Sequence, residues 1–298
     1  LVKSGAYRDL DQPVVLASGQ LGIYFINTEK LLGDGGKWKE FGDDPVGMYT
    51  HLLNVVDSNP DFAEVIGVLR DKARNLLLEP SPTSYRVISG GQRRDWVFSM
   101  PVASKLQISH LTQFKDQDPV LLWGAGYQME KPIQERDYQT VHIVDLITEG
   151  SSIYTNKDGN ETGWLPGIRS VSTHPEEVKG LIAVVDRLQG GKEMLASQGV
   201  GLTSCVDIDE HFLWNFSVDK GRAFAYHSDP TAWSEEYLRE HGATAFAGVF
   251  DPNGANLKRA GNFMDRYETV LRDAGKLQEL ETAVQERYKQ PINVILGR

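Results

Sequence analysis

A short apolar strand that runs directly into a turn of small and hydroxylic residues constrains this fold more than any other stretch. Residues 141–147 read Val-His-Ile-Val-Asp-Leu-Ile, and residues 148–153 read Thr-Glu-Gly-Ser-Ser-Ile. An apolar run that is closed by turn residues is typical of a buried parallel strand. In an open α/β sheet, ligands bind outside the carboxyl ends of such strands. The sequence therefore predicts an α/β fold with a binding site at the end of this strand.

The turn offers backbone N–H and side-chain O–H donors beside one acid, Asp145. A concave run of backbone amides binds phosphate, and glycine lets the backbone approach the anion closely. A carboxylate beside such a loop suits a ligand that carries sugar hydroxyls and phosphate, with a divalent cation between them. The alternative is an ordinary strand–turn edge of an α/β protein with no ligand.

The same stretch resembles the phosphoribosyl diphosphate (PRPP) motif of the type I phosphoribosyltransferases. That motif is an apolar strand, two adjacent acids, two apolar residues, Thr, any residue, Gly and small residues, and Val144 stands where the family usually has its first acid. The resemblance implies that Asp145 holds the ribose hydroxyls directly or through Mg²⁺, which binds together with PRPP. It also implies that the turn holds the 5′-phosphate of PRPP with Thr148, Glu149, Gly150, Ser151 and Ser152.

A second stretch follows one strand later. Residues 180–185 form an apolar run, Asp186-Arg187 end it, Gln-Gly-Gly at 189–191 opens a helix, and 199–202 lead into another strand. This order resembles the signature of the orotate phosphoribosyltransferases. The resemblance implies that Arg187 binds the carboxylate or carbonyl edge of a pyrimidine, for which a guanidinium fork is suited. The alternative is a structural acid–arginine cluster that closes a strand–helix turn.

Residues 14–30 predict two strands joined by a turn at Ser18, and they resemble the N-terminal hood of the orotate enzymes. The resemblance implies that Ser18, Tyr24 and Phe25 lie beside the base. The family's Lys is replaced by Ala17. A β-hairpin with aromatic core residues is the alternative.

The diphosphate loop of the family corresponds to the end of a strand predicted at 85–89. A helix is predicted from Val97 to Leu111, and the preceding turn contains Arg93 and Arg94. These two arginines are candidates for binding diphosphate oxygens. Exposed turn arginines are the alternative.

Another strand is predicted at 120–123, and in the orotate family a mobile loop rich in Lys and carrying His-Gly follows it and closes over the site of the neighbouring subunit. Here residues 124–132 retain only Lys131 as a basic candidate, and the His is absent. Lys131 and Asp145 are therefore the two catalytic candidates, and the missing groups put catalytic activity in doubt.

Composition limits the kinds of partner. The 298-residue chain has a formal charge of −10 and a pI of about 5.2, which argues against a nucleic-acid partner but not against a small anion. No apolar run reaches the roughly 18 residues that span a bilayer, so we expect no membrane association. Cys205 is the only cysteine, which excludes an intramolecular disulfide and favours a cytoplasmic location. No Cys or His spacing fits zinc.

We expect a phosphoribosyltransferase-type open parallel sheet flanked by helices, divided into three parts. Residues 1–80 form an N-terminal hood and a helical pair that ends at the Pro-rich break 79–83. Residues 81–210 form the core, in which 154–175 is a poor helix former. Residues 211–298 form a helical C-terminal extension packed on the core, with an amphipathic stretch at 257–288.

The resemblance implies an enzyme of pyrimidine nucleotide biosynthesis that transfers phosphoribosyl from PRPP to a pyrimidine-type base and releases diphosphate, and by analogy a homodimer. Two alternatives stay open. One is a catalytically weak or inactive relative that binds PRPP or a nucleotide, which the substitutions Ala17 and Val144 favour. The other is a phosphoribosyltransferase for a different base.

Overall fold

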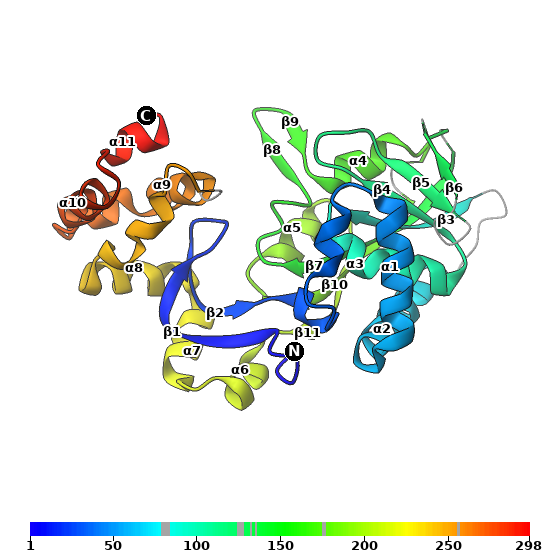
Figure 1. Cartoon of the computed structure of the whole chain (residues 1–298), viewed down its shortest axis with the longest axis horizontal. Coiled ribbons are helices and arrows are strands. Elements are labelled where there is room, and N and C mark those ends of the chain that lie inside the picture. Colours follow the sequence, from blue (N-terminus) through cyan, green and yellow to red (C-terminus); the bar gives the residue numbers. More distant parts are fainter. Residues whose placement is uncertain (79–83, 124–127, 132, 135, 175–176, 255–256) are drawn as a thin grey trace. The chain divides into compact units, whose positions relative to one another are not determined.

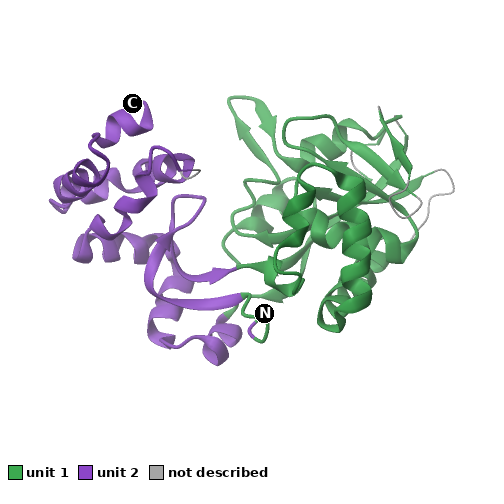
Figure 2. Ribbon diagram, viewed as in Figure 1, with its two compact units in different colours: residues 1, 3–6, 27–209 green, residues 2, 7–26, 210–298 purple. Residues whose placement is uncertain are grey.

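A computed structural model describes residues 1–78, 84–123, 128–131, 133–134, 136–174, 177–254 and 257–298 of the chain. The expected break at 79–83, and residues 124–127 and 132 of the expected loop at 124–132, lie outside the described residues. The chain forms two compact units (Figure 2). Unit 1 contains residues 1, 3–6 and 27–209, and unit 2 contains residues 2, 7–26 and 210–298.

Unit 1 holds the central sheet and the helices around it (Figure 1). Its elements in chain order are η1 Thr28–Leu31, η2 Lys37–Phe41, α1 Pro45–Ser58, α2 Pro60–Leu76, β3 Tyr85–Gly91, α3 Arg94–Leu106, β4 Ser109–Gln113, β5 Val120–Trp123, β6 Gln128–Glu130, β7 Tyr138–Ile147, β8 Thr155–Lys157, β9 Asn160–Thr162, α4 Trp164–Ser170, β10 Val178–Asp186, α5 Gly191–Ser197 and β11 Leu202–Asp207.

The described residues of unit 1 form a seven-stranded sheet with the strand order β11-β10-β7-β3-β4-β5-β6. The strands from β11 to β4 run parallel to one another, whereas β5 and β6 are antiparallel additions at one edge. The chain leaves β3 toward β4 and later returns to the other side of β3 with β7. The predicted α/β fold with a mostly parallel sheet is thus confirmed, and its switch point lies between β3 and β7.

Helices cover both faces of this sheet. On one face α3 packs against β3 and β7, and α1 and α2 pack against α3. On the other face the apolar side chains of α4 and α5 join those of the strands in one buried cluster. Because side chains alternate along a strand, neighbouring residues of β7 face opposite layers: Asp145 faces α3, and Val144 lies in the cluster on the other face.

The boundaries after β3 differ from those expected. The helix predicted from Val97 to Leu111 instead spans Arg94–Leu106 and ends where Gln107 adopts a left-handed conformation with φ of 57°. The next residues form β4, which is largely buried although only Leu111 of its five residues is apolar, so the sequence contains no strand pattern that would have ended the helix. The segment 154–175, a poor helix former, contains the β8–β9 hairpin followed by the short helix α4.

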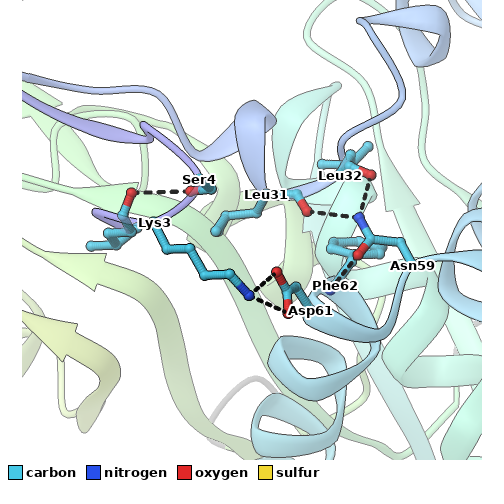
Figure 3. A network of polar contacts seen from close by, with 8 residues as sticks. Lys3, Ser4, Leu31, Leu32, Asn59, Asp61 and Phe62 are labelled. Atoms are coloured by element: carbon cyan, nitrogen blue, oxygen red, sulfur yellow. Dashed lines mark hydrogen bonds and ion pairs between the residues drawn. The ribbon is translucent and has the colours of Figure 1, made fainter.

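A network of polar contacts fixes the start of unit 1 to α2 (Figure 3). The Lys3 ammonium group lies 2.9 Å from Asp61 Oδ2. The Asn59 amide, at the N-cap of α2, donates to the carbonyl of Leu32 at 2.7 Å and accepts the Phe62 N–H at 3.2 Å. One side chain therefore caps α2 and holds the end of η1, so η1 has a defined place in unit 1.

Unit 2 is a β-hairpin together with C-terminal helices. Tyr226 donates to the carbonyl of Leu21 at 2.8 Å, and Asn262 donates to the carbonyl of Ala17 at 2.9 Å. Its elements are β1 Tyr7–Val15, β2 Leu21–Ile26, α6 Glu210–Phe216, α7 Lys220–Ser228, α8 Pro230–His241, η4 Thr244–Phe250, α9 Leu257–Asp273, α10 Leu277–Tyr288 and α11 Ile292–Leu296.

The two units divide the chain differently from the expected three parts. Residues 7–26, which we assigned to the N-terminal hood, form one unit with residues 210–298. The helical pair α1 and α2, assigned to the same hood, belongs to the unit that contains the sheet. None of the helices in the described part of the chain is long and apolar enough to cross a bilayer.

Candidate active site

Three neighbouring strands bring the predicted residues of unit 1 to one edge of the sheet. The strands β3, β7 and β10 are adjacent and parallel, so their carboxyl ends lie side by side. Arg94 follows β3, Asp145 and the turn 148–152 end β7, and Arg187 follows β10. Sequence positions about 50 residues apart are thus collected at the switch point, where open α/β sheets bind ligands.

Asp145 lies at the centre of this edge and is almost fully buried. Its Oδ2 accepts a hydrogen bond from the Thr28 hydroxyl at 2.9 Å and lies 3.5 Å from Nη1 of Arg94. Its backbone N–H donates to Oδ1 of Asp95 at 3.0 Å. The carboxylate is held by Thr28 of η1 and Arg94 of α3. The Arg94 side chain is 54% exposed, so it reaches from the buried carboxylate to the protein surface.

Asp95 is the second carboxyl group at this edge, and it is also buried. Burial raises the pKa of Asp95 well above its usual range, and the nearby charge of Asp145 raises it further. Two buried carboxyl groups so close together disfavour double ionisation.

The turn after β7 has the properties of an anion-binding loop. Gly150 adopts φ of +81°, and a Cβ added there would overlap the methyl group of Met194. The backbone N–H groups of Gly150, Ser151 and Ser152 donate to no acceptor within the described residues. Ser151 and Ser152 are exposed, and Thr148 and Glu149 are half-buried. Unsatisfied amides at an exposed turn are suited to bind phosphate oxygens.

Backbone hydrogen bonds join this turn to the end of β10. The Gly191 N–H, at the start of α5, donates to the carbonyl of Thr148 at 2.9 Å, and the Arg187 N–H donates to the carbonyl of Ile147 at 3.0 Å. Asp186 accepts the Leu188 N–H at 2.8 Å. Burial raises the pKa of Asp186, and this accepted hydrogen bond opposes the rise. The predicted phosphate turn and Arg187, which is only 4% exposed, thus form one connected edge.

A divalent cation has few protein ligands here. Within the described residues no cluster of three or more His, Cys, Asp or Glu side chains is able to hold a metal ion. Mg²⁺ commonly uses one or two carboxylates and takes its other ligands from substrate phosphates and water. Asp145 is one such carboxylate, so the site fits a magnesium ion that arrives with a phosphorylated substrate.

No protein-family model matches the sequence. The orotate phosphoribosyltransferase of Aquifex aeolicus is 24% identical over 211 residues, which are 70% of this chain and 93% of that protein. The chain is therefore similar in sequence to an orotate phosphoribosyltransferase, a member of the type I phosphoribosyltransferase family.

Two solved structures of this family are also similar. The orotate phosphoribosyltransferase of Aeropyrum pernix is 19% identical, with 72% of this chain and 95% of that chain covered and a TM-score of 0.44. The Mycobacterium tuberculosis enzyme solved in complex with PRPP is 15% identical, with 65% and 86% covered and a TM-score of 0.32.

The two arginines expected in the diphosphate loop point to different partners. Arg94 lies beside Asp145, whereas the Arg93 guanidinium group lies 3.7 Å from Asp43 and is 42% exposed. Lys131 is exposed at the end of β6. In the strand order β6 stands four positions from β7, about 19 Å at the usual strand spacing. In this chain Lys131 is therefore not collected with Asp145, and its catalytic role stays a prediction that needs a second subunit.

The residues expected beside the base lie in unit 2. Tyr24 is buried, with its ring 5.7 Å from that of Tyr7 and 5.8 Å from that of Tyr226. Phe25 is 46% exposed on the other face of β2, and Ser18 lies in the β1–β2 turn. The two-strand prediction is confirmed. The role of these side chains in base binding stays a prediction.

Two side chains of the site were missed by reasoning from the sequence. Thr28 and Asp95 contact Asp145 across 117 and 50 residues of chain, respectively. Neither stands in a motif, and a lone Thr or Asp near a helix start is usually a capping residue. The sequence contains one indirect indication of a further acid. Val144 stands where the family usually has its first motif acid, so one acid was missing from the predicted site.

Buried histidines lie under the site, on β4 and β7. His110 contacts the Ser99 hydroxyl at 2.8 Å and the Thr112 hydroxyl at 2.7 Å, and His142 contacts the Ser89 hydroxyl at 3.1 Å. Burial lowers the pKa of both imidazoles to about 3. Both imidazoles are therefore packed inside the layers of unit 1.

Because of these two histidines, we expect the free energy of unfolding of unit 1 to fall at acidic pH. Their pKa is lower in the folded than in the unfolded chain, so stability is complete above about pH 6.5 and is lost as the pH falls toward 3. Each histidine contributes a slope of about 1.4 kcal/mol per pH unit in that window. We expect His142→Gln to remove about half of the combined slope, measured by hydrogen–deuterium exchange of β3, β4 and β7 in urea. The exposed His241→Gln is the control, and an unchanged slope in His142→Gln contradicts the prediction.

Proposed function

We propose that this protein transfers the phosphoribosyl group of PRPP to a pyrimidine-type base such as orotate and releases diphosphate, with Mg²⁺ bound together with PRPP. The single observation that carries the proposal is the turn after β7, whose free amides lie next to the buried Asp145 at the switch point of the sheet. The curated relative named orotate phosphoribosyltransferase supports it. A role in pyrimidine biosynthesis and a homodimeric state belong to the same proposal.

In this proposal the chain acts mainly by holding PRPP in place. The amides of residues 150–152 and the hydroxyl groups of Thr148, Ser151 and Ser152 bind the 5′-phosphate. Asp145, fixed by Thr28 and Asp95, holds the ribose hydroxyls. Arg94 is exposed enough to turn toward the diphosphate. When bound, Mg²⁺ neutralises negative charge on the diphosphate as it leaves.

Phosphoribosyl transfer breaks the bond between C1 of ribose and diphosphate, and a base nitrogen forms the new bond to C1. The transition state resembles an oxocarbenium ion, so positive charge develops on the ribose. A carboxylate held at a fixed place near the sugar stabilises such charge more than a mobile one does. The enclosure of Asp145 by η1 and α3 provides this fixed placement.

Arg187 is the proposed base-binding residue of unit 1. We expect Arg187→Ala to raise the KM for the base by about tenfold, because the base loses one charge-assisted hydrogen-bonding contact. We expect the Kd of PRPP to change less than about threefold. Steady-state kinetics with orotate and calorimetry with PRPP measure the two quantities. Arg187→Lys keeps the charge without the fork and is expected to recover only part of the loss. A loss of PRPP affinity without a change in the KM for the base removes this assignment.

A catalytically weak or inactive PRPP-binding relative is the second candidate. Val144, at the position of the first motif acid, is 2% exposed and packs in the apolar cluster with Ile147 and Trp164. Lys131 is not collected with the site in this chain. The first observation means that one acid for holding the ribose is missing. The second means that this chain does not place Lys131 where it would neutralise the departing diphosphate.

Two measurements separate the candidates. Titration calorimetry with PRPP and Mg²⁺ tests binding, and the absorbance change of orotate tests turnover. Binding with turnover supports the orotate enzyme, and binding without turnover supports the inactive relative or an enzyme for another base, which a panel of bases then distinguishes. If neither PRPP nor turnover is detected, the proposed function is wrong.

A further inference from the structure

The site contains a second carboxyl group that the PRPP motif does not supply. Asp95 stands in the first turn of α3, where an acid ordinarily interacts with the helix N-terminus. Its side chain instead reaches β7 and accepts the backbone N–H of Asp145 at 3.0 Å. Asp95 is 8% exposed, so its carboxyl group has lost most of its hydration. Such burial costs free energy of folding, which the hydrogen bond to Asp145 offsets in part.

The contact acts on the residue that most needs a fixed position. Asp145 is near the end of β7, next to the turn that leaves the sheet. The Asp95 carboxyl binds the main chain of Asp145, and the Thr28 hydroxyl binds its side chain. The α3 backbone at Asp95 is itself held, since the Ser99 hydroxyl donates to the Asp95 carbonyl at 2.8 Å. Asp95 is therefore a rigid support.

Position 144 is unable to provide such a group. Val144 faces the apolar cluster on the opposite face of the sheet from α3. An acid there would have to enter that cluster or displace its neighbours, whereas Asp95 approaches Asp145 from the layer that Asp145 itself faces. The second carboxyl group at this end of the sheet thus comes from the first turn of α3, next to Arg94.

We propose that Asp95 is a positioning residue, which holds Asp145 in the orientation that binds the ribose of PRPP and so makes up for the acid that is missing at position 144. The inference rests on the proposed function and adds a residue to it. Asp95 acts through the Asp145 main chain and does not contact the substrate. Its contribution therefore requires a hydrogen-bond acceptor at this place and not a negative charge.

The test compares Asp95→Leu with Asp95→Asn. Leu matches the shape but removes the acceptor, and we expect the Kd of PRPP with Mg²⁺ to rise by about tenfold or more. Asn keeps an oxygen for the Asp145 N–H, and we expect a Kd within about threefold of wild type. In the Asp145→Asn background, Asp95→Leu is expected to change the Kd by less than about twofold, because the residue through which it acts is already altered.

Controls separate positioning from general loss of stability. Val102→Ala removes buried apolar volume from the same helix and is expected to lower the Tm without changing the Kd of PRPP. If Asp95→Leu does not fold, the Asn variant still decides, because a positioning role requires tight binding and a charged ligand role requires weak binding. Wild-type affinity in a folded Asp95→Leu, or weak binding by Asp95→Asn, overturns the inference. Failure of the proposed function is seen separately, as absence of PRPP binding by the wild-type chain.

Discussion

Replacing Asp145 by Asn is expected to weaken the binding of PRPP with Mg²⁺ by about a hundredfold, close to 3 kcal/mol. The substitution keeps the backbone N–H that Asp95 accepts and nearly the same shape, so it removes the charge alone. The carboxylate is lost for the ribose hydroxyls and for the cation, and Arg94 loses its partner at 3.5 Å. Titration calorimetry at constant magnesium concentration measures the change.

Asp207→Asn is a matched control for this experiment. Asp207 ends β11 at the same edge of the sheet, is exposed, and its loss changes the net charge by the same amount. We expect the PRPP affinity of Asp207→Asn to stay within about twofold of wild type, since the charge of an exposed side chain is screened by salt. Equal effects of the two substitutions would show that the whole edge attracts PRPP and that Asp145 has no special part in it.

Replacing Gly150 by Ala is expected to reduce PRPP affinity by about a hundredfold or more. The φ of +81° costs a residue with a Cβ about 1 kcal/mol, and the added Cβ would also overlap the Met194 methyl group. The Met194 methyl group is the end of a flexible side chain and can move aside, so the backbone strain at residue 150 is what shifts the turn, and its amides then no longer converge on one phosphate. Calorimetry with PRPP, and separately with ribose 5-phosphate, measures the loss of the phosphate contribution.

Gly159→Ala separates the backbone effect from the site. Gly159 is at the tip of the β8–β9 hairpin with φ of +85°, and an added Cβ would meet nothing within 4 Å. It carries the same backbone cost without touching the phosphate turn, so we expect slightly lower stability and unchanged PRPP affinity. Tight PRPP binding by a folded Gly150→Ala variant would falsify the proposed phosphate turn.

Local patterns were enough to predict the strands and turns that bear the motifs. The strand ending at Ile147, the strand ending at Asp186 and the helical pair before the sheet are all present. Each is defined by its own apolar pattern and by turn residues within a few positions. The helix predicted to continue to Leu111 was wrong, because β4 is a buried strand with a single apolar residue and therefore lacks the apolar pattern by which a strand is recognised.

The site was predicted in part for the same reason. The turn 148–152 and Arg187 were predicted as site residues because short motifs carry them, and the parallel strand order places them at one end of the sheet, while their roles stay predictions. The motifs contain no information about which other side chains approach that edge. Arg94 lies beside Asp145 and Arg93 does not, although the sequence treats the two neighbours alike.

By itself the sequence determined the type of fold, the resemblance to the orotate phosphoribosyltransferases and the residues that follow β7 and β10, because these are properties of local order along the chain. Only the tertiary structure decided what surrounds Asp145. Thr28 and Asp95 reach it from 117 and 50 residues away, and Val144 is turned to the opposite face by the alternation of one strand. A hydrogen bond acts over about 3 Å, so the partners of a buried carboxylate depend on how the layers pack and not on distance along the chain.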